Sequence, residues 1–576
     1  YVSGITIAYV TAETFPVTAT SINFFGCSFT SISEDTFTHI TGLTTLIIRR
    51  SGLTFMPDIS KSRITTLNLI GNAITVDSKY KGTLPDTIEY LALNSNQIHW
   101  LPPGFINGSN LRLVSLGGNA FINFPATSLG LLPNIMYFGI ESNQLTKISS
   151  NHLLPLNTST FVHLNLSNNA IQYLQRGAFS QLQNLKILEL HGNSISQISK
   201  GVFEDLKELV HLDLHHNKLE KLTSESFIDL EKLIEFRLHS QTPAMTTIMF
   251  DSMINIGKAL KYLFISQNGF THLPHQIFME GNFTELIELY AENNLIRNVA
   301  ELEERAYGVK RRPIYLQKKQ HFSAFTTTPN IVKLYLQNNL IEMINNTDFC
   351  GLQGLELLNL QSNVLNETHI QEEGFKCLPV MNDLDLRNNH NMQYVPVALT
   401  THERLPSIQT LRLENNIISI LPSETFTNVS TLINLYLDNN RIVAVEDGAF
   451  PYQVNTIYMR NNDFRFIHEH PFSYLSQLRS LYLGNNAVDY IPDDAFINAT
   501  SLAYLQLSSN KMTQIKKVHF KNCPLTSGLY LSSNEIGWIE DGSLNHVTSS
   551  GTLYIKWSAP ILKQKCYDVQ KNKQKR

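Results

Sequence analysis

Three neighbouring stretches repeat one phrase: LNLSNN at 164–169, LELHGN at 188–193 and LDLHHN at 212–217. Their closing asparagines, Asn169, Asn193 and Asn217, are 24 residues apart. The alternation Leu-x-Leu predicts a short strand with one buried face, because successive strand residues point to opposite sides. The closing amide both donates and accepts hydrogen bonds, so it can pair with the backbone where the strand turns away.

The same spacing continues along most of the chain and gives about 22 repeats. A fixed period of this size indicates stacked structural units, because one unit cannot bury its leucines alone. Cys27, Ser51, Gln241 and Ser558 are polar substitutes at the closing position. The other closing positions are Asn72, Asn96, Asn119, Asn143, Asn169, Asn193, Asn217, Asn268, Asn294, Asn339, Asn363, Asn389, Asn416, Asn440, Asn462, Asn486, Asn510 and Asn534.

A phenylalanine column follows the same period and predicts a stacked aromatic spine on the side of the core away from the strands. Its members are Phe37, Phe105, Phe179, Phe203, Phe227, Phe278, Phe349, Phe375, Phe426, Phe450, Phe472, Phe496 and Phe520.

The pattern L-x-x-L-x-L-x-x-N, with Leu-Pro after the asparagine at Leu101-Pro102 and Leu421-Pro422, resembles the extracellular animal leucine-rich repeat. It is similar to Toll-like receptor ectodomains and to secreted proteins of the chaoptin, connectin and acid-labile-subunit types. The resemblance covers roughly residues 20–560. It implies an α/β solenoid, a leucine-rich repeat horseshoe with a concave parallel β-sheet, and possible pairing of two such horseshoes.

The pattern also divides the chain. Residues 1–20 lack the phrase and predict an N-terminal extended cap, for which a hairpin is one form; residues 21–560 form the solenoid. An insertion at about 298–328 interrupts the period, and three interpretations stay open: a tolerated loop, a partner or dimer contact, or a protease-sensitive site. Residues 561–576 are a basic C-terminal tail, predicted to be a solvated end.

Composition excludes several classes of function. The net charge is −4 and charged residues make up 16%, so nucleic acid is an improbable partner. The sequence has no run of 18 apolar residues, so we expect no membrane span. The first residue is Tyr1 and no signal-like segment follows, which predicts a mature secreted product or an excised ectodomain.

The sequons and cysteines fit a secreted or extracellular location. Cys350 and Cys377 are 27 residues apart, each close behind a spine phenylalanine, and are expected to form a disulfide. Cys566 in the tail is the best candidate for a free or intermolecular thiol. N-linked glycans are expected at Asn107, Asn157, Asn165, Asn282, Asn345, Asn366, Asn428 and Asn498.

A histidine column occupies one outward position in three successive repeats: His191, His215 and His239, with His216 adjacent. Its charge is expected to change between about pH 5 and 7. Polar residues on a solvated sheet are the favoured interpretation, and a pH-dependent contact with an anionic or protein ligand is the alternative that stays open. A flat ladder offers imidazoles side by side, so we expect no metal and no other cofactor here.

A tyrosine column occupies the position between the two strand leucines. It comprises Tyr290, Tyr335, Tyr436, Tyr458, Tyr482, Tyr530 and Tyr554, and Arg412 and Arg460 lie close to it in the repeat pattern. Tyrosine also favours strands for reasons of packing alone. An exposed aromatic stripe with arginine is nevertheless typical of a protein-binding surface.

Catalytic motifs such as a nucleophile elbow, His-Glu-x-x-His, a Walker loop or paired-cysteine zinc spacing are absent. The sequence therefore predicts a non-catalytic extracellular protein that binds a protein or glycoconjugate through its concave face and dimerises. A secreted structural or adhesive matrix protein that self-assembles is the alternative. A nucleic-acid or pathogen-pattern sensor is a third hypothesis, suggested by the resemblance alone.

Overall fold

The computed structural model divides into two compact units, Tyr1–Phe270 with Gln276–Leu289 (unit 1) and Thr271–His275 with Tyr290–Arg576 (unit 2). The structure describes residues 2–7, 9–30, 32–222, 226–227, 230–249, 252–253, 256, 258–274, 277–278, 283–299, 325, 328–400, 407–466, 469–545, 547 and 552–555.

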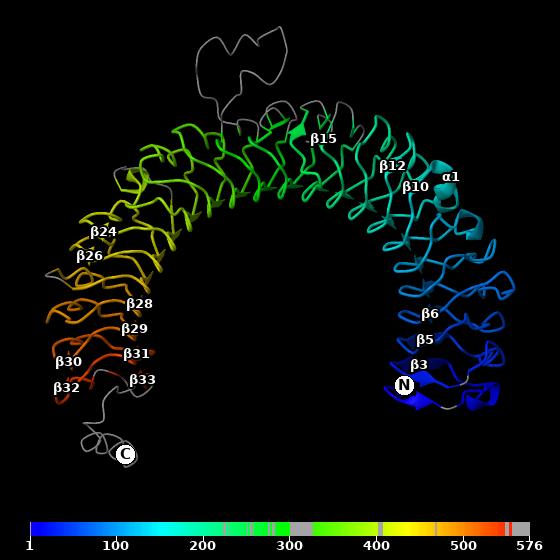
Figure 1. Ribbon diagram of the computed structural model, residues 1–576, viewed down its shortest axis with the longest axis horizontal. Helices are drawn as coiled ribbons and strands as arrows, with labels where there is room; N and C mark the ends of the chain where they lie inside the picture. The colour runs from blue at the N-terminus through cyan, green and yellow to red at the C-terminus, as the bar shows by residue number, and fades with distance from the viewer. Residues whose placement is uncertain are drawn as a thin grey trace, which may run out of the picture. The chain divides into compact units, whose positions relative to one another are not determined.

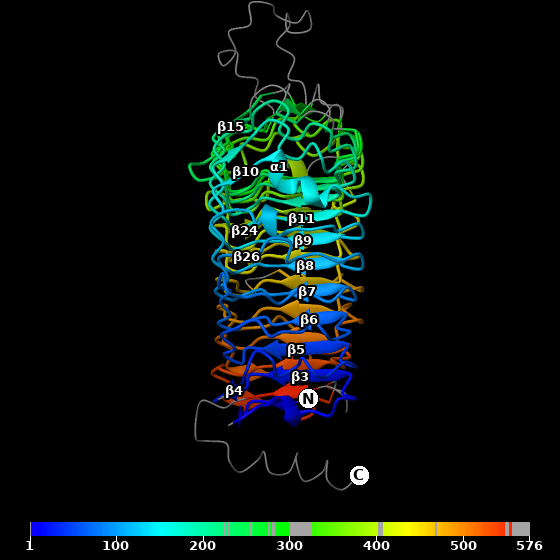
Figure 2. The same cartoon turned by 90° about the vertical axis from the view of Figure 1, so that its right-hand side faces the viewer.

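Unit 1 is a solenoid whose successive turns each add one strand to a parallel sheet (Figures 1 and 2). Each strand pairs in register with the next one of the sheet along the chain, so equivalent residues of neighbouring repeats lie side by side. The strands are β1 (Val2–Ser3), β3 (Ser21–Phe25), β5 (Thr45–Arg49), β6 (Thr66–Asn68), β7 (Tyr90–Ala92), β8 (Leu113–Ser115), β9 (Tyr137–Gly139), β11 (His163–Asn165), β13 (Ile187–Glu189), β14 (His211–Asp213), β16 (Glu235–Arg237) and β18 (Tyr262–Phe264).

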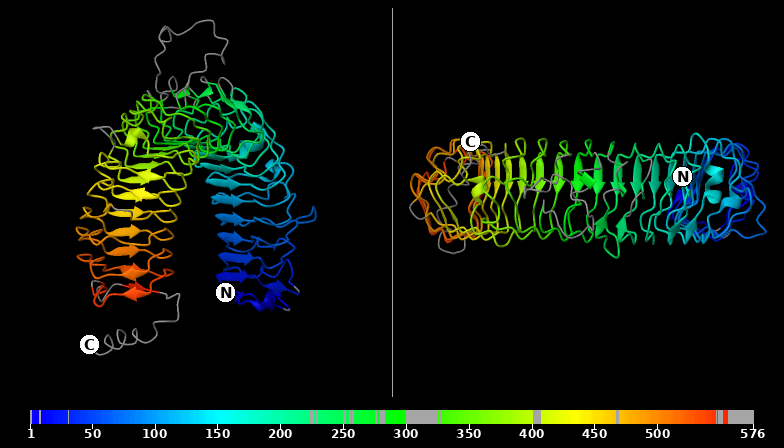
Figure 3. Two further views of the ribbon diagram at one scale, coloured as in Figure 1. Left: turned by 60° about the vertical axis from the view of Figure 1, so that its left-hand side comes forward. Right: turned by 90° about the horizontal axis from the view of Figure 1, so that it is seen from above.

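Unit 2 follows the same plan, and Figure 3 shows its strands stacked like rungs. It begins its part of the sheet with Tyr290 of β19 (Glu288–Tyr290). The strands that follow are β20 (Lys333–Tyr335), β21 (Leu357–Asn359), β22 (Asp383–Asp385), β23 (Thr410–Arg412), β25 (Asn434–Tyr436), β27 (Thr456–Tyr458), β28 (Ser480–Tyr482), β29 (Tyr504–Gln506), β31 (Gly528–Tyr530) and β33 (Thr552–Tyr554).

The side of each turn opposite the sheet carries only short elements (Figure 1). Parallel two-residue strands pair there between neighbouring repeats. These pairs are β2 (Thr6–Ile7) with β4 (Ser28–Phe29), β10 (Lys147–Ile148) with β12 (Tyr173–Leu174), β15 (Lys221–Leu222) with β17 (Thr247–Ile248), β24 (Ile420–Leu421) with β26 (Ala444–Val445), and β30 (Gln514–Ile515) with β32 (Trp538–Ile539). Among the described residues, the helical turns with complete bounds are α1 (Ser150–Leu153) and the 3₁₀ turns η1 (Ala12–Thr14), η2 (Ala126–Ser128), η3 (Leu154–Leu156) and η6 (Val397–Leu399).

The closing asparagines hold neighbouring turns together, as the sequence predicted. The amide of Asn217 donates to the carbonyl oxygens of Leu190 (3.0 Å) and Leu214 (3.0 Å), and its oxygen accepts from the backbone N–H of Ile195 (3.0 Å). Gln241 makes the equivalent bonds, donating to Leu214 and Leu238. Each closing side chain therefore satisfies backbone groups of its own repeat and of the preceding ones.

The core is apolar and continuous within each unit. The central strand residues, such as Leu212 and Leu435, have no exposed surface. The phenylalanine spine is confirmed: Phe179 and Phe203 stack with ring centroids 5.9 Å apart, and Phe426 stacks on Phe450 at 6.2 Å. These rings fill the space behind the strands.

The N-terminal segment is not a hairpin. β1 pairs with β3 in parallel, and β2 pairs with β4 in parallel, so these residues add one more turn to the solenoid. The sequence missed this turn because residues 1–20 hold no closing asparagine. Most of the predicted insertion at 298–328 and the whole tail at 561–576 lie outside the described residues.

Candidate binding sites on the sheet face

The exposed side of the parallel sheet, called the sheet face below, carries six tyrosine rings in one row in unit 2. We call the row Tyr436, Tyr458, Tyr482, Tyr504, Tyr530 and Tyr554 the tyrosine ladder. Its first rings are stacked, with centroids 4.5 Å apart between Tyr436 and Tyr458 and 4.4 Å apart between Tyr458 and Tyr482. The register places these three residues directly opposite one another on β25, β27 and β28. Five of the rings are partly exposed, and Tyr554 is 50% exposed.

Tyr504 is a member that sequence reasoning missed. The residue opposite Tyr482 on β29 is Gln506, so the predicted column is interrupted there. Tyr504 comes from the strand position two residues earlier, and its ring lies 4.8 Å from Tyr482 and 5.0 Å from Tyr530. The two positions are on the same side of the strand because side-chain direction alternates. A search that allowed neighbouring outward columns would have found it.

Arginine side chains frame the ladder. The Arg460 guanidinium lies 5.5 Å from the Tyr458 ring centroid and 5.3 Å from that of Tyr482, a distance at which a cation is attracted to a ring. Two of its nitrogens donate to Asp438, at 2.9 and 2.7 Å. Arg412 lies 5.5 Å from the Tyr436 ring and pairs with Asp383. Both arginines that the sequence selected therefore contact the ladder, each held by an aspartate.

Burial raises the pKa of the hydroxyls of Tyr436, Tyr458, Tyr482 and Tyr504 above that of a free tyrosine. These four hydroxyls are therefore uncharged at neutral pH. The ladder offers flat apolar surface with hydroxyl groups that can donate or accept hydrogen bonds. Tyr290 and Tyr335 form a separate pair earlier in unit 2, stacked at 4.6 Å.

The histidine column of unit 1 is a second row of stacked rings. His215 lies between His191, 4.5 Å away, and His239, 4.4 Å away. We call these three residues the histidine ladder. His216 is exposed beside it and its backbone has a positive φ of 51°. The equivalent residue of several other repeats is glycine or asparagine, and histidine is another residue type enriched in that conformation.

The expected titration of this ladder between pH 5 and 7 is wrong for His239. Burial, together with the nearby His215, lowers the pKa of its imidazole to about 4, so the ring stays neutral over that range. Burial also lowers the pKa of His191. The expectation treated the side chains as solvated, whereas stacking covers their faces.

Asp213 is a second residue of the site that sequence reasoning left out. It lies at the end of β14, is 3% exposed, and accepts a hydrogen bond of 2.5 Å from Nδ1 of His215. Nδ1 of His191 lies 3.5 Å from its other carboxylate oxygen. The expectation of no metal rested on side-by-side imidazoles alone and did not consider this carboxylate between them.

Other predicted residues have simpler outcomes. Cys350 and Cys377 form the expected disulfide. Cys27 and Cys523 are buried and free, and Cys566 lies outside the described residues. Asn282 also lies outside them. Of the remaining sequon asparagines, Asn107, Asn157, Asn428 and Asn498 are exposed, whereas Asn165, Asn345 and Asn366 are partly buried. Within the described part of the chain, no helix has both the length and the apolar character needed to cross a bilayer.

Comparisons with known proteins agree with the repeat. A family model described as "Leucine rich repeat" matches residues 159–219, 183–240, 329–391, 430–488, 452–512 and 477–536. Lumican of Bos taurus is 30% identical over 190 residues, which cover 32% of this chain and 51% of lumican. Toll-like receptor 9 of Bos taurus is 30% identical over 138 residues, covering 22% of this chain and 13% of the receptor. The chain thus spans about half the length of lumican.

A solved structure of the Toll–Spatzle complex from Drosophila matches with a TM-score of 0.52 at 16% identity. The match covers 94% of this chain and 78% of that one. At this identity the likeness shows the fold, which is the predicted solenoid with a parallel sheet. The chain therefore has the leucine-rich repeat fold, matches the leucine-rich repeat model over these stretches, and is similar in sequence to lumican and Toll-like receptor 9.

Proposed function

We propose that this protein is a non-catalytic extracellular binding protein that holds a protein or glycoconjugate partner on its sheet face. The observation that carries the proposal is the tyrosine ladder, an unbroken row of six rings with Arg412 and Arg460 beside it. Tyrosine and arginine are enriched among the residues that dominate binding energy.

The stacking supports recognition for a thermodynamic reason. A tyrosine side chain loses little conformational entropy on binding, and rings already stacked lose less. The raised pKa of the Tyr458 and Tyr482 hydroxyls keeps these two rings uncharged, so a partner would not have to compensate phenolate charge there. A polysaccharide ring or an apolar protein side chain can pack on such a surface, while the arginines can donate hydrogen bonds to carboxylate or sulfate groups.

Two further observations support the extracellular location. The Cys350–Cys377 disulfide belongs to oxidising compartments. The exposed sequons at Asn107, Asn157, Asn428 and Asn498 can be reached by a glycosylation enzyme, and we propose that they carry N-linked glycans. A mass decrease after enzymatic removal of N-glycans from the native protein would support that assignment, and an unchanged mass would remove it.

The test uses the purified full chain on an array of extracellular proteins and sulfated and neutral glycans. For every probe that binds the wild type, we expect the triple variant Tyr436→Ser, Tyr458→Ser, Tyr482→Ser to bind at least about tenfold more weakly, because hot-spot side chains each contribute about 2 kcal/mol. The matched control is Tyr452→Ser with Tyr474→Ser, which changes exposed tyrosines of unit 2 outside the ladder.

The proposal fails if the triple variant binds each probe as the wild type does, or if the control loses binding equally. A wild type that binds no probe but associates with itself at micromolar concentration would favour the self-assembling structural protein instead. Reduction of that association by the triple variant would then place the self-contact on the same ladder.

A further inference from the structure

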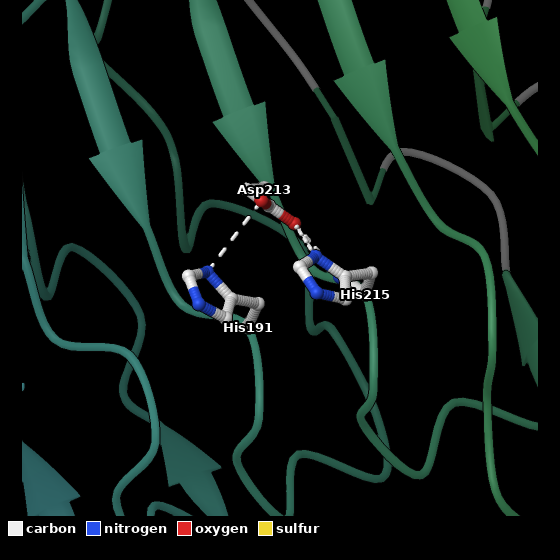
Figure 4. A group of neighbouring side chains, drawn as sticks. All are labelled: His191, Asp213 and His215. Carbon is white, nitrogen blue, oxygen red and sulfur yellow. Dashed lines mark hydrogen bonds and ion pairs between the residues drawn. The ribbon is translucent and has the colours of Figure 1, made fainter. Parts of the chain in front are cut away.

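Three potential metal ligands converge on the sheet face of unit 1. His191, Asp213 and His215 each direct one ligand atom toward the others, and these atoms all lie within 4.8 Å of one another (Figure 4). The tyrosine ladder lies in unit 2, so this cluster is separate from the surface of the proposed function.

The repeat itself builds the cluster. Asp213 and His215 are two residues apart and therefore point to the same side of the chain. His191 occupies the position of His215 in the preceding repeat, and its ring is held parallel to that of His215 at an angle of 9°. The parallel register of β13 and β14 fixes this arrangement, since Leu188 pairs with Leu212 and Glu189 pairs with Asp213.

The ligand atoms of the three residues face one another, and one of them has no hydrogen-bond partner. Nδ1 of His191 is buried and makes no hydrogen bond, although an Asp213 carboxylate oxygen lies 3.5 Å away. Nδ1 of His215 donates to the other oxygen of Asp213 at 2.5 Å. The side chain of Asp213 is 4% exposed. Burying a carboxylate costs free energy unless a cation or hydrogen-bond donors compensate its charge. A carboxylate beside two imidazoles is also a common set of metal ligands.

We infer that His191, Asp213 and His215 bind a zinc ion through Nδ1 of each histidine and a carboxylate oxygen. Two imidazoles and one carboxylate are a ligand set that zinc prefers, and calcium and magnesium prefer oxygen ligands alone. Tetrahedral bonds of about 2.0–2.1 Å require ligand atoms to lie a little over 3 Å apart, so side-chain rotations must bring the three atoms to that spacing. The proton on Nδ1 of His215 must also move to Nε2, which leaves the lone pair of Nδ1 for the zinc ion.

The charges around the cluster suit a divalent cation. The Asp213 carboxylate lies between the two imidazoles, 2.5 Å from Nδ1 of His215 and 3.5 Å from Nδ1 of His191, and supplies negative charge at the centre of the cluster. Arg237 opposes binding, with a nitrogen 3.9 Å from Asp213, but Glu235 holds that arginine at 2.6 Å.

Three protein ligands leave one position of a tetrahedral ion open. Water or a group supplied by a partner can fill it. Two more histidines lie beside the cluster. His239 stacks on His215, but its Nδ1 is paired with the Ser240 hydroxyl at 3.0 Å. The ring centroid of His216 lies 4.9 Å from that of His215. We do not count either histidine among the ligands.

The experiment titrates the untagged full chain with zinc at neutral pH by calorimetry and by competition with a chromogenic chelator. We expect one tightly bound ion per chain and a higher melting temperature in its presence. Each of His191→Ala, Asp213→Asn and His215→Ala should weaken binding at least about tenfold, because even the loss of a residue that only supports a ligand has this effect.

The matched control is His216→Asn, since asparagine occupies the equivalent left-handed position at Asn168 and Asn293. It should bind zinc as the wild type does. Melting temperatures without zinc identify any variant that has lost its fold, and Asp213→Asn keeps the shape of the side chain. The inference is overturned if the wild type binds no zinc at micromolar concentration, or if folded ligand variants keep its affinity, which would place the ion on other histidines.

Discussion

The histidine ladder of unit 1 and the tyrosine ladder of unit 2 are built on the same repeat but exchange the places of rings and charges. In unit 1 the position between the strand leucines holds Glu189, Asp213 and Arg237, and the rings stand two residues later. In unit 2 the rings of Tyr436, Tyr458 and Tyr482 occupy the first position, and Asp438 and Arg460 stand two residues later.

This exchange changes the chemistry of the sheet face without changing its backbone. In unit 1 the ring nitrogens face an aspartate at close range, which suits a metal ion. In unit 2 an arginine lies beside the faces of rings that stay uncharged, which suits a carbohydrate or protein surface. The same repeat can therefore bind different kinds of ligand when its aromatic residues occupy a different outward-facing position of the strand.

The largest effect on stability is expected from the closing asparagines, a feature that the two regions share. Asn217 closes the repeat of His215 and Asn440 closes the repeat of Tyr436, and each side chain bonds four backbone groups. Replacing either with alanine leaves those buried groups unsatisfied and should lower the free energy of unfolding by about 3 kcal/mol. Urea denaturation measures it. A loss at one site but not the other would mean that the two scaffolds are not equivalent.

The next effect concerns the pH dependence of stability, in which the two regions should differ. The pKa of His239 is about 4 in the folded protein and about 6.5 when free, so below pH 6.5 the unfolded state takes up a proton that the folded state does not. Its contribution therefore lowers stability as the pH falls from about 6.5 to about 4 and is constant above that window.

The variant His239→Gln should lose less stability than the wild type across that window, as measured by urea denaturation at a series of pH values. Tyr458→Phe in the other ladder should follow the wild-type profile, because its hydroxyl does not titrate there. Parallel profiles for the wild type and His239→Gln would contradict a neutral, buried His239.

A smaller effect is expected from ring contact itself. A double-mutant cycle on Tyr436 and Tyr458 should give a coupling of about 1 kcal/mol, because an aromatic pair contributes about 0.5–1.5 kcal/mol beyond its buried area. The corresponding cycle on His191 and His215 without zinc should give a coupling at least as large in magnitude, since these rings stack at the same distance and also share one carboxylate. A smaller coupling for the histidines would contradict a shared contact with Asp213.

The smallest effect concerns Arg460. Arg460→Lys removes one of the two side-chain nitrogens bonded to Asp438 and weakens the contact with Tyr458 and Tyr482. We expect the free energy of unfolding to fall by about 0.5–1 kcal/mol. Thermal unfolding checks it against Arg465→Lys, which changes an exposed arginine beyond the closing Asn462. Equal melting temperatures for the two variants would show that the contact contributes nothing measurable.

Much of the fold was predictable because the repeat constrains every turn equally. The closing asparagines, the phenylalanine spine and the Cys350–Cys377 pair each follow from a residue type at a fixed spacing, and the structure confirms them. The first turn, containing β1 and β2, was missed because its pairing is carried by the backbone and not by a closing side chain.

The candidate sites were predictable only in part, for the same reason. Spacing aligned the members of one column, so it found His191, His215 and His239 and most of the tyrosines. It could not find Tyr504 or Asp213, because each completes its ladder or cluster from a different outward position of the strand. Burial by stacking, which lowers the pKa of His239, depends on ring orientation and is also invisible to spacing.

The most direct test of the proposed function is hydroxyl-radical footprinting of the chain alone and bound to a partner found on the array. We predict that the partner protects Tyr436, Tyr458 and Tyr482, while Tyr452 and Tyr474, which are 72% and 69% exposed, react equally in both states. Protection of Tyr452 or Tyr474 with an unchanged ladder would contradict binding on the sheet face of unit 2.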